Sequence, residues 1–196
     1  MKKIIPSLFI IILTSCNSSS VLYQIEREPE VPFSTIKSSK ITFEGLSPKY
    51  VAPVLYSVDS ANALYALELS RQFEESLPSA TLITPQKRSS ESVESDYLWK
   101  ITKIESGDNY LTRETSFTFN PATNQWGSQT ESQKVHIVVY IDFIDLKSKK
   151  TLFKLESMGE FVKDKRYDYW KRALWSSITP VVHYIVSNGK GFKIKK

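Results

Sequence analysis

Two patterns in this sequence could supply a catalytic group, and both are weak. Ser34 and Lys37 fit Ser-x-x-Lys, a spacing at which the lysine can help to activate the serine as a nucleophile. The pattern arises easily by chance in a chain rich in serine and lysine, and the companion motifs Ser-Asp-Asn and Lys-Thr-Gly do not occur. His136 and His183 are the only histidines, and neither belongs to a His-Glu-x-x-His motif. We therefore expect no enzyme activity, no metal and no cofactor.

The single cysteine has a clearer chemical role. Residues 1–3 carry two lysines, residues 4–12 are mostly apolar but too few to span a bilayer, and small residues follow, which is typical of a secretory signal. The order Leu-Thr-Ser-Cys at residues 13–16 resembles the lipobox of bacterial lipoproteins. The resemblance implies a diacylglycerol on the Cys16 sulfur, cleavage that removes residues 1–15 as a signal peptide, and acylation of the new amino terminus. An ordinary secretory signal with a coincidental cysteine is the alternative.

The lipobox also indicates where the protein is held. Three acyl chains, at about 0.8 kcal/mol per buried methylene, make an effectively permanent membrane anchor. In lipoproteins resembling those of enterobacteria, an aspartate directly after the lipidated cysteine retains the protein in the inner membrane, and here that residue is Asn17. We therefore expect an outer-membrane protein that faces the periplasm, with export to the cell surface as the open alternative.

The composition limits the kinds of partner and chemistry. Removing residues 1–15 takes away two lysines and no acid, so the formal net charge falls from +5 to +3. This small excess, without an organised basic stripe, does not favour binding to nucleic acid. With Cys16 acylated, the mature chain has no free thiol, which excludes thiolate catalysis and zinc–thiolate sites. The remaining length fits one domain of ordinary size.

The mature chain divides into three parts. Residues 16–39 begin with a polar stretch, contain Pro29 and Pro32 and show no clear period, which predicts a flexible tether. Apolar residues at positions 21, 22, 23 and 25 nevertheless leave room for a docked strand. Residues 40–187 form the expected periplasmic domain, and residues 188–196 form a basic tail.

Hydrophobic periodicity places the elements of this domain. Strands are predicted at residues 40–44, 80–84, 96–104, 110–119, 130–144 and 151–156. The last four form an antiparallel meander, with turns at residues 106–109 and 120–124. The segment 130–144 has the clearest alternation, with these residues on its core face: Val135, Ile137, Val139, Ile141 and Phe143.

Two helices complete the predicted domain. The first begins with Asp59 or Ser60 as its N-cap, buries Ala66, Leu69 and Phe73, and ends before Pro78. The second runs from about residue 164 to residue 187, and Pro180 should kink or divide it because proline removes a backbone donor. The predicted class is α+β: a mainly antiparallel sheet with two helices packed on one face, preceded by a lipidated flexible tether.

The layout of the domain is similar to that of known envelope lipoproteins. The segment Asp-Tyr-Leu-Trp-Lys-Ile at residues 96–101 is followed by a strand ending in Asp145 and by a lysine-rich turn into Leu152 and Phe153. This layout resembles the TolB N-terminal-like group, which includes curli-secretion and penicillin-binding-protein-activator lipoproteins, and the lipoprotein that plugs a lipopolysaccharide-assembly barrel. The chain departs from the group where Ser148 and Lys149 replace the usual Thr-Gly, and the resemblance implies no functional residue.

Aromatic and basic side chains are the candidates for contacts. Trp126 lies in a turn predicted from Asn124 to Gly127, where it has little reason to be buried, and Tyr169 and Trp175 exceed what one helical face can bury. Ordinary packing is the alternative for these aromatic residues. The tail could contact an anionic surface through Lys190, Lys193, Lys195 and Lys196. A solubilising, frayed terminus is the alternative.

Three functions follow from these observations. The leading hypothesis is a non-enzymatic, outer-membrane-anchored accessory or scaffold that binds an envelope protein. The alternative is a module that binds or carries lipid or glycolipid, which would need a deep apolar pocket between the helices and the sheet. The third is a hydrolase that uses carboxylates, which a cleft with two buried acids would support.

Overall fold

The computed structural model describes residues 18–47, 57–85, 94–120, 125–162 and 168–194, with the backbone alone for residues 18, 19, 107–120, 125–133, 193 and 194. Cys16 and Asn17 therefore lie outside the described residues. The elements in chain order are β1 (Ser18–Arg27), α1 (Phe33–Ile36), β2 (Lys40–Glu44), α2 (Val58–Ser76), β3 (Thr81–Ile83), β4 (Tyr97–Asn120), β5 (Gln125–Asp145), β6 (Lys150–Val162), α3 (Tyr169–Ser176), α4 (Ile178–Val186) and β7 (Lys193–Ile194).

The fold is α+β, built on one mixed sheet of seven strands in the order β3-β2-β4-β5-β6-β1-β7. The central pairs β4–β5, β5–β6 and β6–β1 are antiparallel. The outer pairs β3–β2, β2–β4 and β1–β7 are parallel, so the expectation of a mainly antiparallel sheet holds for its centre alone. The parallel pair β2–β3 arises because α2 crosses over between the two strands, and a crossover returns the chain in the same direction.

The predicted four-strand meander is wrong, because three longer strands replace it. No turn interrupts β4 at residues 106–109; instead its pairing with β5 shifts register between Gly107 and Tyr110. A β-bulge of this kind absorbs residues that would otherwise form a turn. The predicted turn at 120–124 falls mostly on residues outside the described part of the chain.

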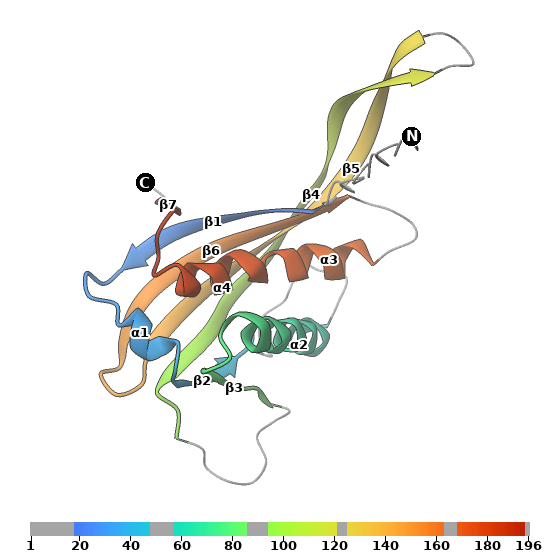
Figure 1. The fold of residues 1–196 in the computed structure, drawn as a ribbon. Coiled ribbons are helices and arrows are strands. Elements are labelled where there is room, and N and C mark those ends of the chain that lie inside the picture. The colour runs from blue at the N-terminus through green and yellow to red at the C-terminus, as the bar shows by residue number, and fades with distance from the viewer. Residues whose placement is uncertain (1–17, 48–56, 86–93, 121–124, 163–167, 195–196) are drawn as a thin grey trace, which may run out of the picture.

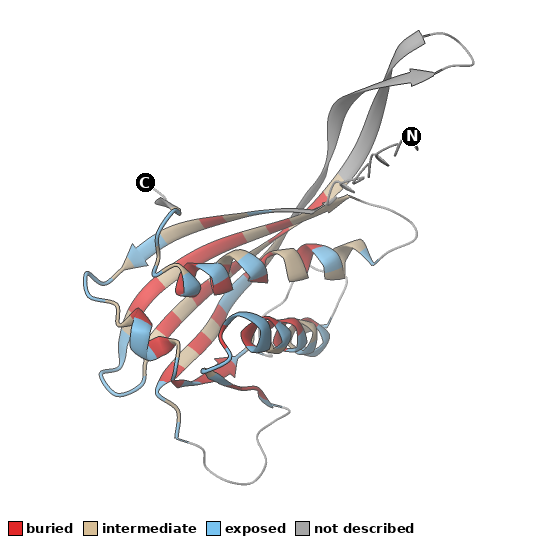
Figure 2. Cartoon of the chain, viewed as in Figure 1, coloured by how far each residue is buried: buried red, intermediate tan, exposed pale blue. Residues whose placement is uncertain are grey.

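The helices lie on one face of the sheet, where they bury its apolar side chains (Figures 1 and 2). All five residues predicted for the core face of β5 are buried, and the residues between them are half-buried. Aromatic side chains fill the space between the helices and the sheet. For example, Trp99 of β4 contacts Phe73 of α2, with their ring centroids 5.9 Å apart. The opposite face of the sheet carries the polar positions, as expected for an antiparallel centre with one wet side.

Both predicted helices form, with corrections at their ends. The N-cap of α2 is Ser57, whose side chain accepts a hydrogen bond from the Ser60 amide, rather than Asp59 or Ser60. The second helix is divided, since α3 ends at Ser176 and α4 begins at Ile178. This break lies one turn before Pro180, whose missing N–H leaves the Ser176 carbonyl without its helical donor.

The predicted flexible tether is wrong for residues 18–39, because this segment belongs to the domain. β1 pairs with β6 from Ser18 opposite Phe161 to Arg27 opposite Phe153. Farther along, Ile36 of α1 is fully buried at 0% exposure. The domain therefore begins at residue 18 rather than 40, and the strand β7 extends it into the predicted basic tail.

Candidate functional site

The most distinctive feature of the molecule is a long two-stranded ribbon, which we call the arm: residues 111–120 of β4 and 125–133 of β5. At its base, Lys134 pairs with both Tyr110 in β4 and Val162, the last residue of β6. Beyond that point β4 and β5 pair only with each other among the described strands, and Figure 1 shows them projecting past the rest of the sheet. The ten residues of β4 beyond Tyr110 correspond to about 33 Å. An isolated two-stranded ribbon is marginally stable in water, so the arm depends on the sheet from which it extends.

The register of the arm places polar residues along its length and aromatic residues near its far end. Arg113 stands opposite Glu131, an oppositely charged cross-strand pair. Phe119 stands opposite Trp126. Trp126 thus lies in a strand rather than in the predicted turn, where the Asn and Gly neighbours had suggested a reversal. Its side chain is outside the described part of the structure.

The start of the domain lies at the base of the arm. Ser18 pairs with Phe161 of β6, and Phe161 pairs with Val135 of β5, the residue that follows Lys134. Because neighbouring strands are about 4.8 Å apart, the first residue of β1 lies about 10 Å from the arm's base. We call this edge of the molecule the arm end. Cys16 precedes Ser18 by two residues and so connects to the domain at the arm end.

Helix α3 brings two of the predicted contact residues to the same region, both half-buried. Trp175 donates from Nε1 to the Leu64 carbonyl at 3.3 Å, which ties α3 to α2. Two cations lie over its ring, Lys171 Nζ at 4.3 Å and Arg172 Cζ at 5.5 Å from the centroid. Tyr169 lies against Trp170, with ring centroids 6.0 Å apart. Neither cation was predicted as a contact residue, although their position beside the aromatic residues was a usable signal.

The structure separates the basic tail from the arm end. The exposed Lys190 follows Gly189, whose carbonyl accepts a hydrogen bond from Arg27 at 3.4 Å. Arg27 is the last residue of β1, nine residues from Ser18, which corresponds to roughly 30 Å. Lys193 lies in β7, whereas Lys195 and Lys196 are outside the described residues. Lys190 is therefore not brought to the place where Cys16 joins the domain.

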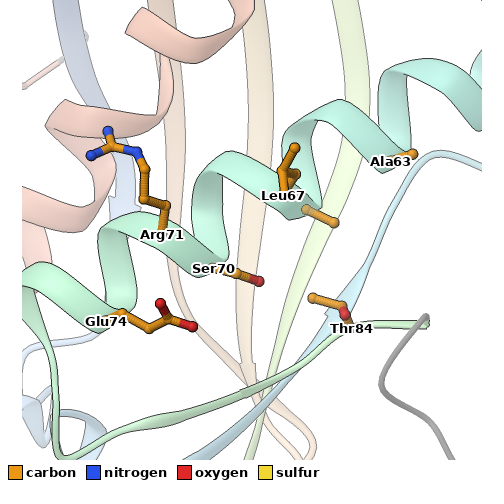
Figure 3. A pocket seen from close by; sticks show the side chains of 7 residues that line it. Ala63, Leu67, Ser70, Arg71, Glu74 and Thr84 are labelled. Carbon is orange, nitrogen blue, oxygen red and sulfur yellow. The ribbon is translucent and has the colours of Figure 1, made fainter.

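A groove of about 460 Å³ runs between α2 and the segment after β3 (Figure 3). It is lined by Ala63, Ala66, Leu67, Ser70, Arg71, Glu74 and Thr84. Leu67 is 64% exposed beside it, and Arg71 is held by ion pairs to Glu68 and Glu75. All of its lining residues belong to α2 or follow the edge strand β3. It does not match the deep pocket that the carrier hypothesis requires.

The face of the sheet away from the helices carries a row of charges of alternating sign on five adjacent strands. In register, this row consists of Glu26, Lys154, Asp142, Lys100 and Glu44. Its ends are ion pairs, Lys154 to Glu26 at 2.6 Å and Lys100 to Glu44 at 2.9 Å. Opposite charges across strands favour the register that pairs them. The row therefore has a structural explanation and points to no ligand.

The centre of this row gives a testable pH dependence. Burial raises the pKa of Asp142 above its ordinary value, and the positive charges of Lys154 and Lys100 offset only part of that effect. A carboxyl group whose pKa is higher in the folded state than in the unfolded state stabilises the fold while it is protonated. That stabilisation is lost as the pH rises through the folded-state pKa. We expect Asp142→Asn to remove it and to change stability at pH 7 by less than about 1 kcal/mol. Urea unfolding at pH 4 and pH 7 measures this, and a large loss for the variant at pH 7 alone would contradict it.

The residues considered for catalysis are not brought together. Lys37 Nζ donates to the Val186 carbonyl at 2.8 Å and to Asn188 Oδ1 at 2.7 Å, so it caps the end of α4. Ser34 is exposed on α1. His136 lies on β5 opposite Glu160, whereas His183 lies on α4, where its ring contacts Phe192. Lys37 thus has a structural role that the spacing to Ser34 did not reveal.

No group of three or more His, Cys, Asp or Glu side chains in the described ranges is placed to hold a metal ion. Within the same ranges, no helix has the length and apolar character needed to cross a membrane.

Comparison with known proteins gives distant structural similarity alone. No protein-family model matches the chain, and no curated protein matches it. The PelC dodecamer from Paraburkholderia phytofirmans superposes with a TM-score of 0.44 at 11% identity, covering 85% of this chain and 97% of that one. A minor lipoprotein from Acinetobacter baumannii gives a TM-score of 0.41 at 9% identity, covering 77% and 94% of the two chains. These values are too low for the properties of either protein to be carried over.

Proposed function

We propose that this protein is a non-enzymatic lipoprotein of the outer membrane, which faces the periplasm and presents its arm to an envelope protein. The observation that carries the proposal is the position of Ser18 at the base of the arm. A lipid on Cys16 would hold the arm end next to the membrane, with a single residue between the cysteine and β1. Asn17 at the sorting position favours the outer membrane.

The register of the arm favours a protein as its partner. Both faces of the ribbon are mostly polar along its length, as the pairs Thr112–Ser132 and Arg113–Glu131 illustrate. The arm therefore lacks the continuous apolar face that insertion among lipid tails requires. Its outer edges carry backbone N–H and C=O groups that another strand can pair with. The aromatic pair Phe119–Trp126 adds side chains of the type that dominate binding energy at protein interfaces.

Site-specific photo-crosslinking in cells tests this proposal. A photoreactive amino acid at position 119 should form an adduct with one envelope protein. The same group at position 147 is the matched control, because Lys147 is exposed in the turn between β5 and β6, at the other end of the sheet. Replacing Trp126 by alanine should reduce the adduct at position 119 by about tenfold or more, as expected for an aromatic anchor. Equal adducts at 119 and 147, or none at 119, would overturn the proposal.

A further inference from the structure

The arm end contains a second feature that the proposed arm contact does not use, the first two turns of α3. Helix α3 packs on β6 so closely that a Cβ on Gly159 would collide with the Ala173 carbonyl oxygen. Tyr169 precedes Ala173 by four helical residues, about 6 Å, and Phe161 follows Gly159 by two strand residues, about 6.6 Å. Since α3 returns along β6, as Figure 1 shows, Tyr169 lies level with Phe161. Phe161 is the partner of Ser18, so α3 begins where the chain enters the domain.

The side chains at this level combine aromatic rings with positive charge. Tyr169 and Trp170 are half-buried, and Lys171 and Arg172 follow directly. Lys171 forms no ion pair with any described residue, and its ammonium group lies over the Trp175 ring. Arg172 is exposed and lies near Glu68 of α2. Besides Glu68, the nearby acids among the described residues are Asp168, which caps α3 by accepting from the Lys171 amide, and Glu160 on the far face of β6.

We infer that the first two turns of α3 form a contact with the phosphate headgroups of anionic phospholipid, made through Tyr169, Lys171 and Arg172. Tyrosine and tryptophan collect at membrane–water interfaces because their rings are apolar and their edges are polar. Lysine and arginine are attracted to anionic lipid when they lie within a Debye length of the surface. This contact rests on the proposed function in one respect, since the anchor at Cys16 is what brings the arm end to the membrane. It would fix the orientation of the domain, and so the direction of the arm.

Sedimentation with lipid vesicles tests the contact without the anchor. The mature chain carrying Cys16→Ala, which has no acyl chains, is mixed with vesicles of phosphatidylcholine and phosphatidylglycerol in equal parts, or of phosphatidylcholine alone. We expect binding to the first vesicles only, and about a tenfold or greater loss of that binding for Lys171→Glu with Arg172→Glu. The matched control is Lys147→Glu with Lys150→Glu, which makes the same change in net charge at two exposed positions far from the arm end, one in the turn after β5 and one at the start of β6. The control pair should keep the binding of the parent chain.

Several results would overturn the inference. Equal binding to both kinds of vesicle, or equal losses for the two charge reversals, would show that no contact is specific to α3. Displacement by millimolar inorganic phosphate would indicate a site for free phosphate rather than a membrane surface. Lys171→Ala with Arg172→Ala is the milder variant in case the charge reversal impairs folding, and it should also weaken binding. The vesicles contain no protein, so a failure here leaves the crosslinking result unaffected, and a failure to crosslink leaves this result unaffected.

Discussion

A chain that begins at residue 40 should fail to fold, whereas a chain that begins at residue 18 should unfold cooperatively. The segment between these starts contributes β1, which pairs with β6, and the buried side chains of Leu22, Phe33 and Ile36. Burial of three such side chains contributes about 1.5–3 kcal/mol each, and the exposed edge of β6 and underside of α4 add to the loss. The sum is comparable to the whole stability of a typical domain, about 5–15 kcal/mol.

Far-ultraviolet circular dichroism and urea unfolding of the two chains measure this effect. The chain from residue 18 is the control, because it lacks only residues outside the described domain. A point variant gives a graded version: Ile36→Ala should cost about 2–5 kcal/mol, while Thr35→Ala, at an exposed neighbouring position, should cost little. If the chain from residue 40 unfolded with the same midpoint and the same denaturant slope as the longer chain, residues 18–39 would be a tether after all.

Strong periodicity explains which elements could be predicted. The segment around β5 alternates over ten residues, and its core face from Val135 to Phe143 was identified correctly. The buried residues of α2 recur at helical spacing, and Pro180 marked the division between α3 and α4. In each case local pattern and tertiary packing favour the same structure, which is the condition under which sequence patterns are reliable.

The segment 18–39 was misjudged because its local signals conflict with its packing. Pro29, Pro32 and four acidic or basic residues between positions 26 and 30 resemble a linker. Its buried residues lie in a strand followed by a single helical turn, too short for either period to be visible. Long-range contacts hold it to the domain, such as the pairing of β1 with β6 and the hydrogen bond from Arg27 to the Gly189 carbonyl at 3.4 Å. No local property of the sequence reports contacts with residues about 160 positions away.

The arm was missed for a related reason. Residues 106–109 read Ser-Gly-Asp-Asn, a composition typical of turns, and the polar residues beyond them weaken the alternation. Pairing between two strands outweighs these preferences, and the bulge near Gly107 accommodates them. The aromatic residues were placed correctly on α3. The role inferred for the cations beside them could not be predicted, because the sequence does not show that Ser18, Phe161 and Tyr169 lie at the same end of the sheet.

Replacing Cys16 by alanine should release the protein from the membrane and abolish its labelling with radioactive palmitate. The reason is the number of acyl chains, since one chain gives marginal binding and a diacylglycerol with an N-acyl chain is effectively permanent. The inferred headgroup contact of α3 cannot replace this anchor, because the two positive charges of Lys171 and Arg172 are screened at physiological ionic strength. Membrane fractionation of cells at low and high salt measures the release.

Ser18→Ala is the control, since it changes the first residue of β1 and leaves the lipobox intact. The two membrane contacts should respond differently to salt, which separates them in one experiment. The wild-type chain should stay with the membrane at high salt, while any Cys16→Ala protein left there at low salt should be washed off. Cys16→Ala protein that resists high salt would contradict the anchor. Without the anchor, there would be no reason to place the arm end at the membrane, because Ser18 would not follow a lipidated residue.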